Sequence, residues 1–209
     1  MTQVLIISKT RKGKTGICIG GVTLPDLVSV RIMQSKGEYH NINTEYDIGQ
    51  IWEMEYTKAP KLIPPHVENV WVQKKKLIKK INEFVPLIND AKLKALVWKG
   101  HPRNLFDEKL RWTGTRHGFL EKSSGISSMS TGFWIPDRDL KYRENYYYYD
   151  DEKGNWNSVF GFKYVGVEKP IEIIPVKTRV RVSLATWWVQ DGVELPLRCY
   201  LQLSGWYLK

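Results

Sequence analysis

Several signals that place a chain in a common class are missing here. No apolar run reaches the roughly 18 residues of a membrane-spanning helix, which excludes that class. The first residues, MTQVLIISKTRKGK, lack the order of a signal peptide and predict a strand. Two cysteines, Cys18 and Cys199, lie in strand-like sequence, so we expect no disulfide framework. These absences favour a reducing, cytoplasmic setting.

Metal-binding and nucleotide-binding motifs are also weak. Neither cysteine has a partner at ligand spacing, and the four histidines are scattered: His40, His66, His101 and His117. The GKT of RKGKTG resembles the end of a P-loop, but Ser8 stands where that motif requires glycine. The residues after it predict a strand and not a helix. We therefore expect no metal and no other cofactor.

Positive charge is abundant. The 209 residues carry a net charge of +10, with a pI near 9.5. Such a surplus favours polyanionic partners, nucleic acid first and an acidic membrane second. A basic but otherwise ordinary soluble protein remains the alternative, and we expect no membrane partner.

Short strand-like segments dominate the chain, separated by Gly, Pro, Asp or Asn. The stretch KKKLIKKINEFVPLIND is the exception, because its apolar residues from Leu77 to Ile88 recur at helical spacing. This order predicts an all-β fold with one or a few helices, built as two tandem OB-like barrels. A single β-sandwich is the competing architecture. The expected domains are an N-terminal barrel with a lysine-rich helix (1–95) and an Arg/aromatic-rich barrel (96–209).

The two halves differ in their cations. The first 99 residues hold 14 of the 22 lysines, whereas the remainder holds 8 of the 10 arginines. Lysine is a flexible point charge, while arginine and aromatic rings offer flat stacking surfaces. The first half is thus predicted to attract nucleic acid electrostatically, as an anchor. The second half is predicted to bind it by stacking, as a reader. The anchor consists of the cluster Lys74, Lys75, Lys76, Lys79 and Lys80, with the basic hairpin tip Arg11, Lys12 and Lys14.

The expected reader face lies on the strands TRVRVSLATWW and LRCYLQLSGWY, each apolar on one side and polar or aromatic on the other. This pattern is typical of a barrel whose outer face binds single-stranded nucleic acid. Alternatively, Trp187, Trp188 and Trp206 fill barrel ends or a domain interface. The predicted face comprises Arg179, Arg181, Trp187, Arg198 and Tyr200, extended by Arg111, Trp112, Arg116, Arg138 and Arg143.

Four consecutive tyrosines, Tyr146 to Tyr149, form another predicted strand. Alternate rings of a strand point to opposite faces, so one pair should enter the core. The other pair should line the binding face or seal the contact between barrels. Which pair does which depends on register.

One catalytic pattern competes with simple binding. Asp137, followed by Asp151, Glu152 and Lys153, fits the PD…(D/E)xK pattern of metal-dependent nucleases. That pattern is short, and DDEKGNW is more typical of a hairpin turn than of the required strand. We therefore predict that the protein is not an enzyme.

The segments VLIISKTRKGKTGICIGGV, STGFWIPDRDL and VRVSLATWW…LRCYLQLSGWY resemble prokaryotic proteins described as dual OB domain-containing. The resemblance runs over nearly the whole chain. It implies two OB-type barrels and a nucleic-acid-binding or sensing role, as an accessory of prokaryotic defence systems. It implies no catalytic residues. An adaptor that docks a larger effector protein through exposed aromatics is the alternative function.

Overall fold

The computed structural model describes residues 1–34, 37–89, 96–114, 117–150, 159–192 and 194–208. In its first half, five strands close into a barrel in the order β1-β5-β6-β3-β2, with β2 returning to β1. Strands β3 and β6 run parallel, and the other pairs are antiparallel. The strands are β1 (Thr2–Lys12), β2 (Gly16–Leu24), β3 (Ser29–Met33), β5 (Gln50–Lys58) and β6 (Asn69–Lys80), with the short β4 (His40–Asn41) beside β2.

Closure of this barrel depends on β1, which pairs with both β2 and β5. A bulge between Ile6 and Ser8 bends the strand between these neighbours, since a bulge increases local twist. Alternate residues such as Val4, Ile6, Ile17 and Ile19 then point into one buried core. The period-two pattern of the sequence therefore predicts the interior correctly.

The predicted lysine-rich helix is wrong. The five lysines lie on strand β6, and helix α1 is one short turn, Val85–Ile88, with Pro86 in its first turn. Strand β6 pairs with β5 from Lys80 to Val70, so backbone hydrogen bonds between the two strands extend along the barrel wall. Leu77 is 45% exposed, so the apparent helical stripe faces no core at that point. Pairing of this segment with β5 therefore determined its conformation, despite the helical spacing of its apolar residues.

The second half repeats the same strand order around β10 (Thr131–Ile135), β11 (Leu140–Arg143), β12 (Tyr146–Tyr149), β13 (Phe160–Tyr164), β15 (Arg179–Leu184) and β16 (Arg198–Tyr207). Strand β13 runs parallel to β16, as β3 does to β6. Strands β10 and β11 are successive parts of one path, joined by residues 136–139. The remaining elements are β7 (Val97–Lys99), β8 (Arg111–Trp112), β9 (Gly118–Glu121), β14 (Ile173–Ile174) and the 3₁₀ helices η2 (Pro102–Glu108) and η3 (Lys122–Ser124).

This arrangement confirms the all-β class with two OB-like units. The predicted boundary between residues 95 and 96 adjoins residues 90–95, which lie outside the described part of the chain. That boundary stays a prediction.

Strand β12 settles which tyrosines enter the core. Tyr147 and Tyr149 are buried, whereas Tyr146 and Tyr148 are partly exposed on the opposite face. The hydroxyl of Tyr147 donates to the Ile171 carbonyl at 2.9 Å, so burial leaves no polar atom unsatisfied there. The outward pair is free to line a surface.

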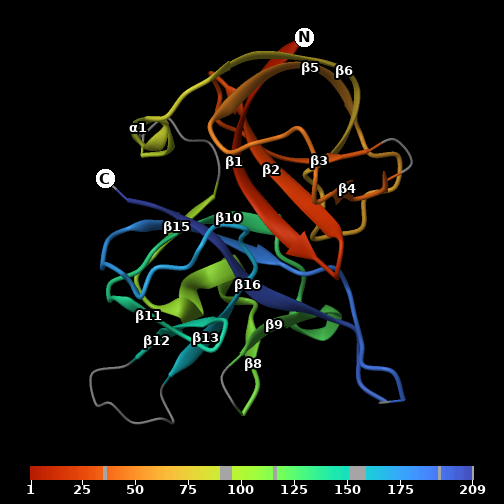
Figure 1. Cartoon of the computed structure of the whole chain (residues 1–209). Coiled ribbons are helices and arrows are strands. Elements are labelled where there is room, and N and C mark those ends of the chain that lie inside the picture. The colour runs from red at the N-terminus through yellow and green to blue at the C-terminus, as the bar shows by residue number, and fades with distance from the viewer. Residues whose placement is uncertain (35–36, 90–95, 115–116, 151–158, 193, 209) are drawn as a thin grey trace.

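The two barrels pack directly against each other, the first drawn in red to orange above the second in green to blue (Figure 1). A shared apolar cluster includes Leu5 and Ile7 of β1, Phe133 of β10 and Tyr207 of β16. The Tyr207 hydroxyl donates to the Ile7 carbonyl at 3.0 Å. Buried aromatic and hydrogen-bonded contacts of this kind hold the barrels in one relative orientation.

Candidate nucleic-acid interface

A groove of about 400 Å³ runs over the outer face of the second barrel. It crosses β12, β13 and β16, and the segment after β15 forms one of its walls. Several aromatic rings and two lysines line it, with no carboxylate among its described residues. The lining residues are Lys12, His117, Tyr146, Gly161, Lys163, Ala185, Thr186, Trp188, Tyr200, Leu201 and Gln202.

A stacked pair of rings forms one side of the groove. The rings of His117 and Tyr146 lie 4.8 Å apart between centroids, with their planes inclined by 12°. Gly161 makes this possible, because a Cβ there would lie 2.9 Å from His117 Cδ2. Burial lowers the pKa of His117 below its ordinary value, which favours the neutral ring near neutral pH. The neutral, nearly parallel rings of His117 and Tyr146 offer a flat surface for stacking.

A second pair of rings stands on the other side. Trp188 and Tyr200 have centroids 6.1 Å apart, and Trp188 is 53% exposed. Two backbone hydrogen bonds between Trp188 and Arg198, of 2.9 and 2.8 Å, hold the tryptophan beside β16. The backbone therefore holds the exposed Trp188 side chain in a defined place beside β16.

Two cations border these rings. Lys163 is exposed on β13, directly opposite Tyr146 of β12 in the strand register. Lys12 reaches across from the first barrel, where its ammonium donates to Thr186 Oγ1 at 2.6 Å. The groove thus combines stacking rings with point charges.

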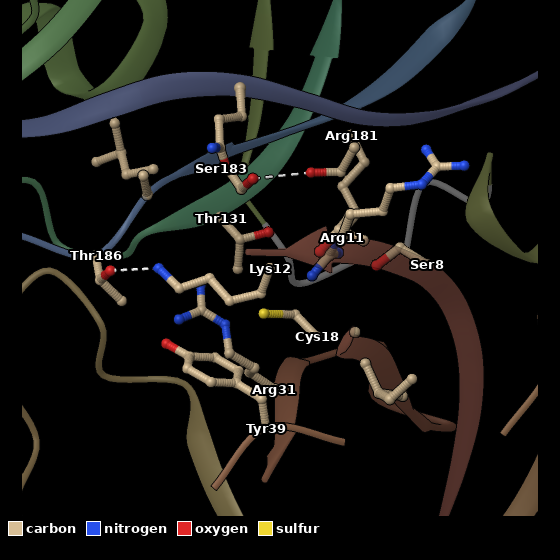
Figure 2. A pocket seen from close by; sticks show the side chains of 17 residues that line it. Ser8, Arg11, Lys12, Cys18, Arg31, Tyr39, Thr131, Arg181, Ser183 and Thr186 are labelled. Atoms are coloured by element: carbon tan, nitrogen blue, oxygen red, sulfur yellow. Dashed lines mark hydrogen bonds between the residues drawn. The ribbon is translucent and has the colours of Figure 1, made fainter. Parts of the chain in front are cut away.

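A smaller pocket of about 60 Å³ lies between the barrels. Figure 2 shows Lys12, Arg31 and Tyr39 gathered in it, with the Lys12 ammonium directed at Thr186. Lys12 and Thr186 line both the pocket and the groove, and so do Ala185 and Gln202. The two hollows therefore adjoin each other, with these four residues at their border.

The comparison with known protein families bears on this architecture. Residues 2–206 match the family of the dual OB-containing domain. The chain belongs to this family. Among curated proteins and solved structures, no significant match exists. Membership agrees with the resemblance noted in the sequence and with the two OB-like barrels.

Two of the predicted site residues of this dual-OB chain, Lys12 and Tyr200, line the groove. Arg181 instead lies between the barrels, 3% exposed, because the first barrel covers the outer face of β15. Arg179 donates to the Ile88 carbonyl of α1. Trp187 packs on the core and its indole donates to the Pro64 carbonyl at 2.8 Å. The alternative of an interface tryptophan therefore holds for Trp187.

Four other predicted arginines contact carboxylate or backbone carbonyl oxygens. Arg111 and Arg198 both pair with Glu121, at 3.2 and 2.7 Å. Arg143 lies 3.8 Å from the Asp150 carboxylate, and Arg138 donates to the Asp150 carbonyl at 3.1 Å. These arginines stand near the barrel surface but outside the groove lining.

The predicted anchor residues are spread over the first barrel. Lys74, Lys75 and Lys80 lie near Glu55, Glu45 and Asp47 respectively, and the whole lysine cluster is exposed on β6. The structure does not bring this cluster into the groove.

Four further predicted residues lie elsewhere. Arg11 binds the carbonyls of Gly166 and Val167, next to the pocket between the barrels. Lys14 is exposed in the turn after β1, whereas Trp112 packs edge-on against Phe160 at 4.6 Å. Arg116 lies outside the described residues.

The predicted anchor and reader face do not include five residues of the groove: His117, Tyr146, Lys163, Trp188 and Gln202. The alternation of the tyrosine run carried a signal for Tyr146, because one of its two pairs had to face outward. No signal distinguished the exposed Trp188 from the partly buried Trp187 beside it. That difference arises from the turn between β15 and β16.

The competing catalytic pattern gains no support from placement. The Asp137 carboxylate accepts a hydrogen bond from Tyr149 Oη at 2.8 Å, and Asp151, Glu152 and Lys153 lie outside the described residues. Within the described ranges, no group of three His, Cys, Asp or Glu side chains could hold a metal ion. No helix among them is long and apolar enough to cross a membrane.

Proposed function

We propose that this protein binds single-stranded DNA or RNA, without catalysing a reaction, in the groove of its second barrel. The observation that carries the proposal is two pairs of rings on one outer face, the stacked pair His117–Tyr146 and the tilted pair Trp188–Tyr200. Bases of a single strand can stack on such rings, whereas bases of a duplex are already stacked on each other.

The position of the groove within the fold supports the same ligand. OB barrels bind oligonucleotides on the face of their second and third strands and on the loop between the fourth and fifth. In the second barrel these elements are β12, β13 and the segment between β15 and β16. Tyr146, Lys163 and Trp188 come from these three elements.

The chemistry of the lining favours low sequence specificity. Every base has a π-face, so stacking tolerates any sequence. Lys163 and Lys12 can each approach a backbone phosphate, which carries no sequence information. The exposed lysines of β6 would add long-range attraction without direct contact in the groove.

Fluorescence anisotropy with labelled single-stranded and duplex DNA and RNA tests the proposal. Tyr146→Ala should weaken single-strand binding by roughly 5- to 150-fold, the range expected for one stacked base. Tyr148→Ala is the matched control, since Tyr148 lies on the same strand and face but outside the groove lining. Affinity should also fall between roughly 50 and 200 mM salt.

Equal effects of the two tyrosine variants would refute the groove as the binding site. A lack of single-strand binding at low salt would refute the function itself.

The adaptor alternative is favoured by one specific observation. Trp188, Leu195 and Leu197 are all at least 43% exposed on the segment between β15 and β16. Exposed apolar groups that cluster on one segment are typical of a protein contact. Binding to an effector through this segment should change little with salt, unlike binding to phosphates.

The setting in prokaryotic defence, which the resemblance noted in the sequence implies, belongs to the same proposal. Deletion of the gene in its native host should raise phage plaque counts, and the Tyr146→Ala form should fail to restore protection. Full protection by that variant would separate the defence role from the groove.

A further inference from the structure

The pocket between the barrels is a built cationic site that the groove does not explain. Four cationic side chains line it: Arg11, Lys12, Arg31 and Arg181. No carboxylate stands among its described lining residues, and Glu68, which pairs with Arg31 at 3.0 Å, is the adjacent negative charge. Four cations against one carboxylate leave a surplus of three positive charges. An anionic ligand would balance them.

Arg181 is the decisive member of the set. It is 3% exposed, and its Nη1 atom has no hydrogen-bond partner within the described part of the chain. Burial lowers the pKa of its guanidinium below the ordinary value, because the charge has lost its water. A buried donor atom that lacks a hydrogen-bond partner is costly, and an anionic ligand would satisfy it.

The pocket offers further donors at the same depth. The Thr131 hydroxyl is buried and also lacks a partner among the described residues. The hydroxyls of Ser183 and Ser204 lie 2.8 Å apart on the wall beside it. Gly20 allows the close approach, since a Cβ there would lie 2.9 Å from Arg181 Nη2. Arginine and hydroxyl donors together suit the oxygens of a phosphate.

The size and the shape of the pocket limit which ligands can fit into it. A volume of about 60 Å³ holds a few water-sized groups, enough for a phosphate but too small for a nucleobase. Its inner residues, Arg181 and Thr131, are buried, whereas Lys12 and Thr186 are partly exposed where the pocket meets the groove. A phosphate monoester is attached to its strand through one oxygen, so it can fill a recess with a single opening. An internal phosphodiester is attached through two oxygens, so the strand would have to enter and leave the recess.

We propose that this pocket binds a phosphate monoester, namely the terminal phosphate of a nucleic-acid strand that lies in the adjoining groove. The inference rests on the proposed function for its source of phosphate, but the pocket itself does not depend on it. A terminal phosphate carries up to two negative charges near neutral pH, which matches the surplus better than a singly charged diester does. The protein would thereby read strand ends as well as single strands.

Competition binding with short unlabelled oligonucleotides tests the inference. The competitors carry a 5′-phosphate, a 3′-phosphate or hydroxyls at both ends, and they displace a labelled hydroxyl-ended strand from the full-length protein. One of the two phosphorylated forms should bind at least about tenfold more tightly than the hydroxyl-ended form. Equal binding of all three would overturn the proposal while leaving the groove intact.

Two variants locate the effect. Arg181→Met and Thr131→Val should abolish the preference for the phosphorylated end, while affinity for the hydroxyl-ended strand stays within about twofold. Thr131→Val is the second route if Arg181→Met does not fold. Lys141→Met is the matched control, since Lys141 is exposed on β11 and lies outside both hollows. Retention of the preference in both pocket variants would overturn the assignment.

A second experiment tests the pocket independently of nucleic-acid binding in the groove. Inorganic phosphate and a mononucleotide are titrated by calorimetry against the wild-type protein and Arg181→Met. Binding to the wild type alone, without any preference for phosphorylated strand ends, would assign the pocket to a free phosphate ligand and overturn the strand-end source. No binding of either small ligand, together with no end preference, would refute the pocket as an anion site.

Discussion

The ion pair between Glu68 and Arg31 offers a sharp test of how the barrel interface is stabilised. The Glu68 side chain is fully buried and that of Arg31 is 12% exposed, with 3.0 Å between Nη2 and Oε1. Ser130 of the second barrel completes the arrangement, accepting from Arg31 at 2.8 Å and donating to Glu68. Glu68→Gln keeps the shape but removes the negative charge.

The expected cost follows from what this variant leaves behind. Arg31 would lose its counter-charge close to the buried Arg181, and loss of one partner of a buried pair costs about 3–5 kcal/mol. The low end applies, since Arg31 retains some contact with water and glutamine retains one hydrogen bond. We expect the free energy of unfolding to fall by about 3 kcal/mol, or roughly 6–12 °C in Tm.

Urea unfolding followed by tryptophan fluorescence measures this loss. The double variant Glu68→Gln/Arg31→Met should cost less than the sum of the single variants, because it leaves no uncompensated charge. A loss below about 1 kcal/mol in Glu68→Gln would refute the reasoning, and so would simple additivity in the double variant.

Three further outcomes are expected. Burial lowers the pKa of His66 to about 4, so the unfolded chain binds a proton at a higher pH than the folded protein does. The free energy of unfolding should therefore fall as the pH drops from about 6.5 toward 4. The same pH profile in wild type and His66→Gln would contradict this. Burial raises the pKa of Cys199 to about 12, so iodoacetamide at neutral pH should label it in urea but not in the folded protein; labelling of the folded protein would count against its burial. Gly161→Ala should displace the His117 ring and weaken single-strand binding about fivefold, whereas Gly114→Ala, where no atom lies within 4 Å of the added Cβ, should bind normally.

Much of the barrel interior follows from alternation in the sequence. The strand TRVRVSLATWW was expected to be apolar on one side, and its alternate residues Val180, Val182 and Leu184 all lie in the second core. The same rule predicted one buried pair in the tyrosine run, which is Tyr147 and Tyr149. Side-chain alternation is a local property of an extended backbone, so the sequence alone is enough to reveal it.

The lysine-rich segment shows where local reasoning fails. Its apolar spacing suited a helix, yet Asn69–Lys80 pairs with β5 over its full length. Pairing with β5 and β3 determines the conformation of this segment, whereas the helical spacing was judged from the segment alone.

The candidate sites depended on tertiary structure in the same way. The sequence by itself determined the all-β class, the basic charge and the alternate faces of each strand. Only the tertiary structure decided that the outer face of β15 is covered, which turns Arg181 from a surface cation into the back of a pocket between barrels. It also separated the exposed Trp188 from its partly buried neighbour Trp187. Alternation tells which residues share a face, but what covers that face depends on contacts between distant segments.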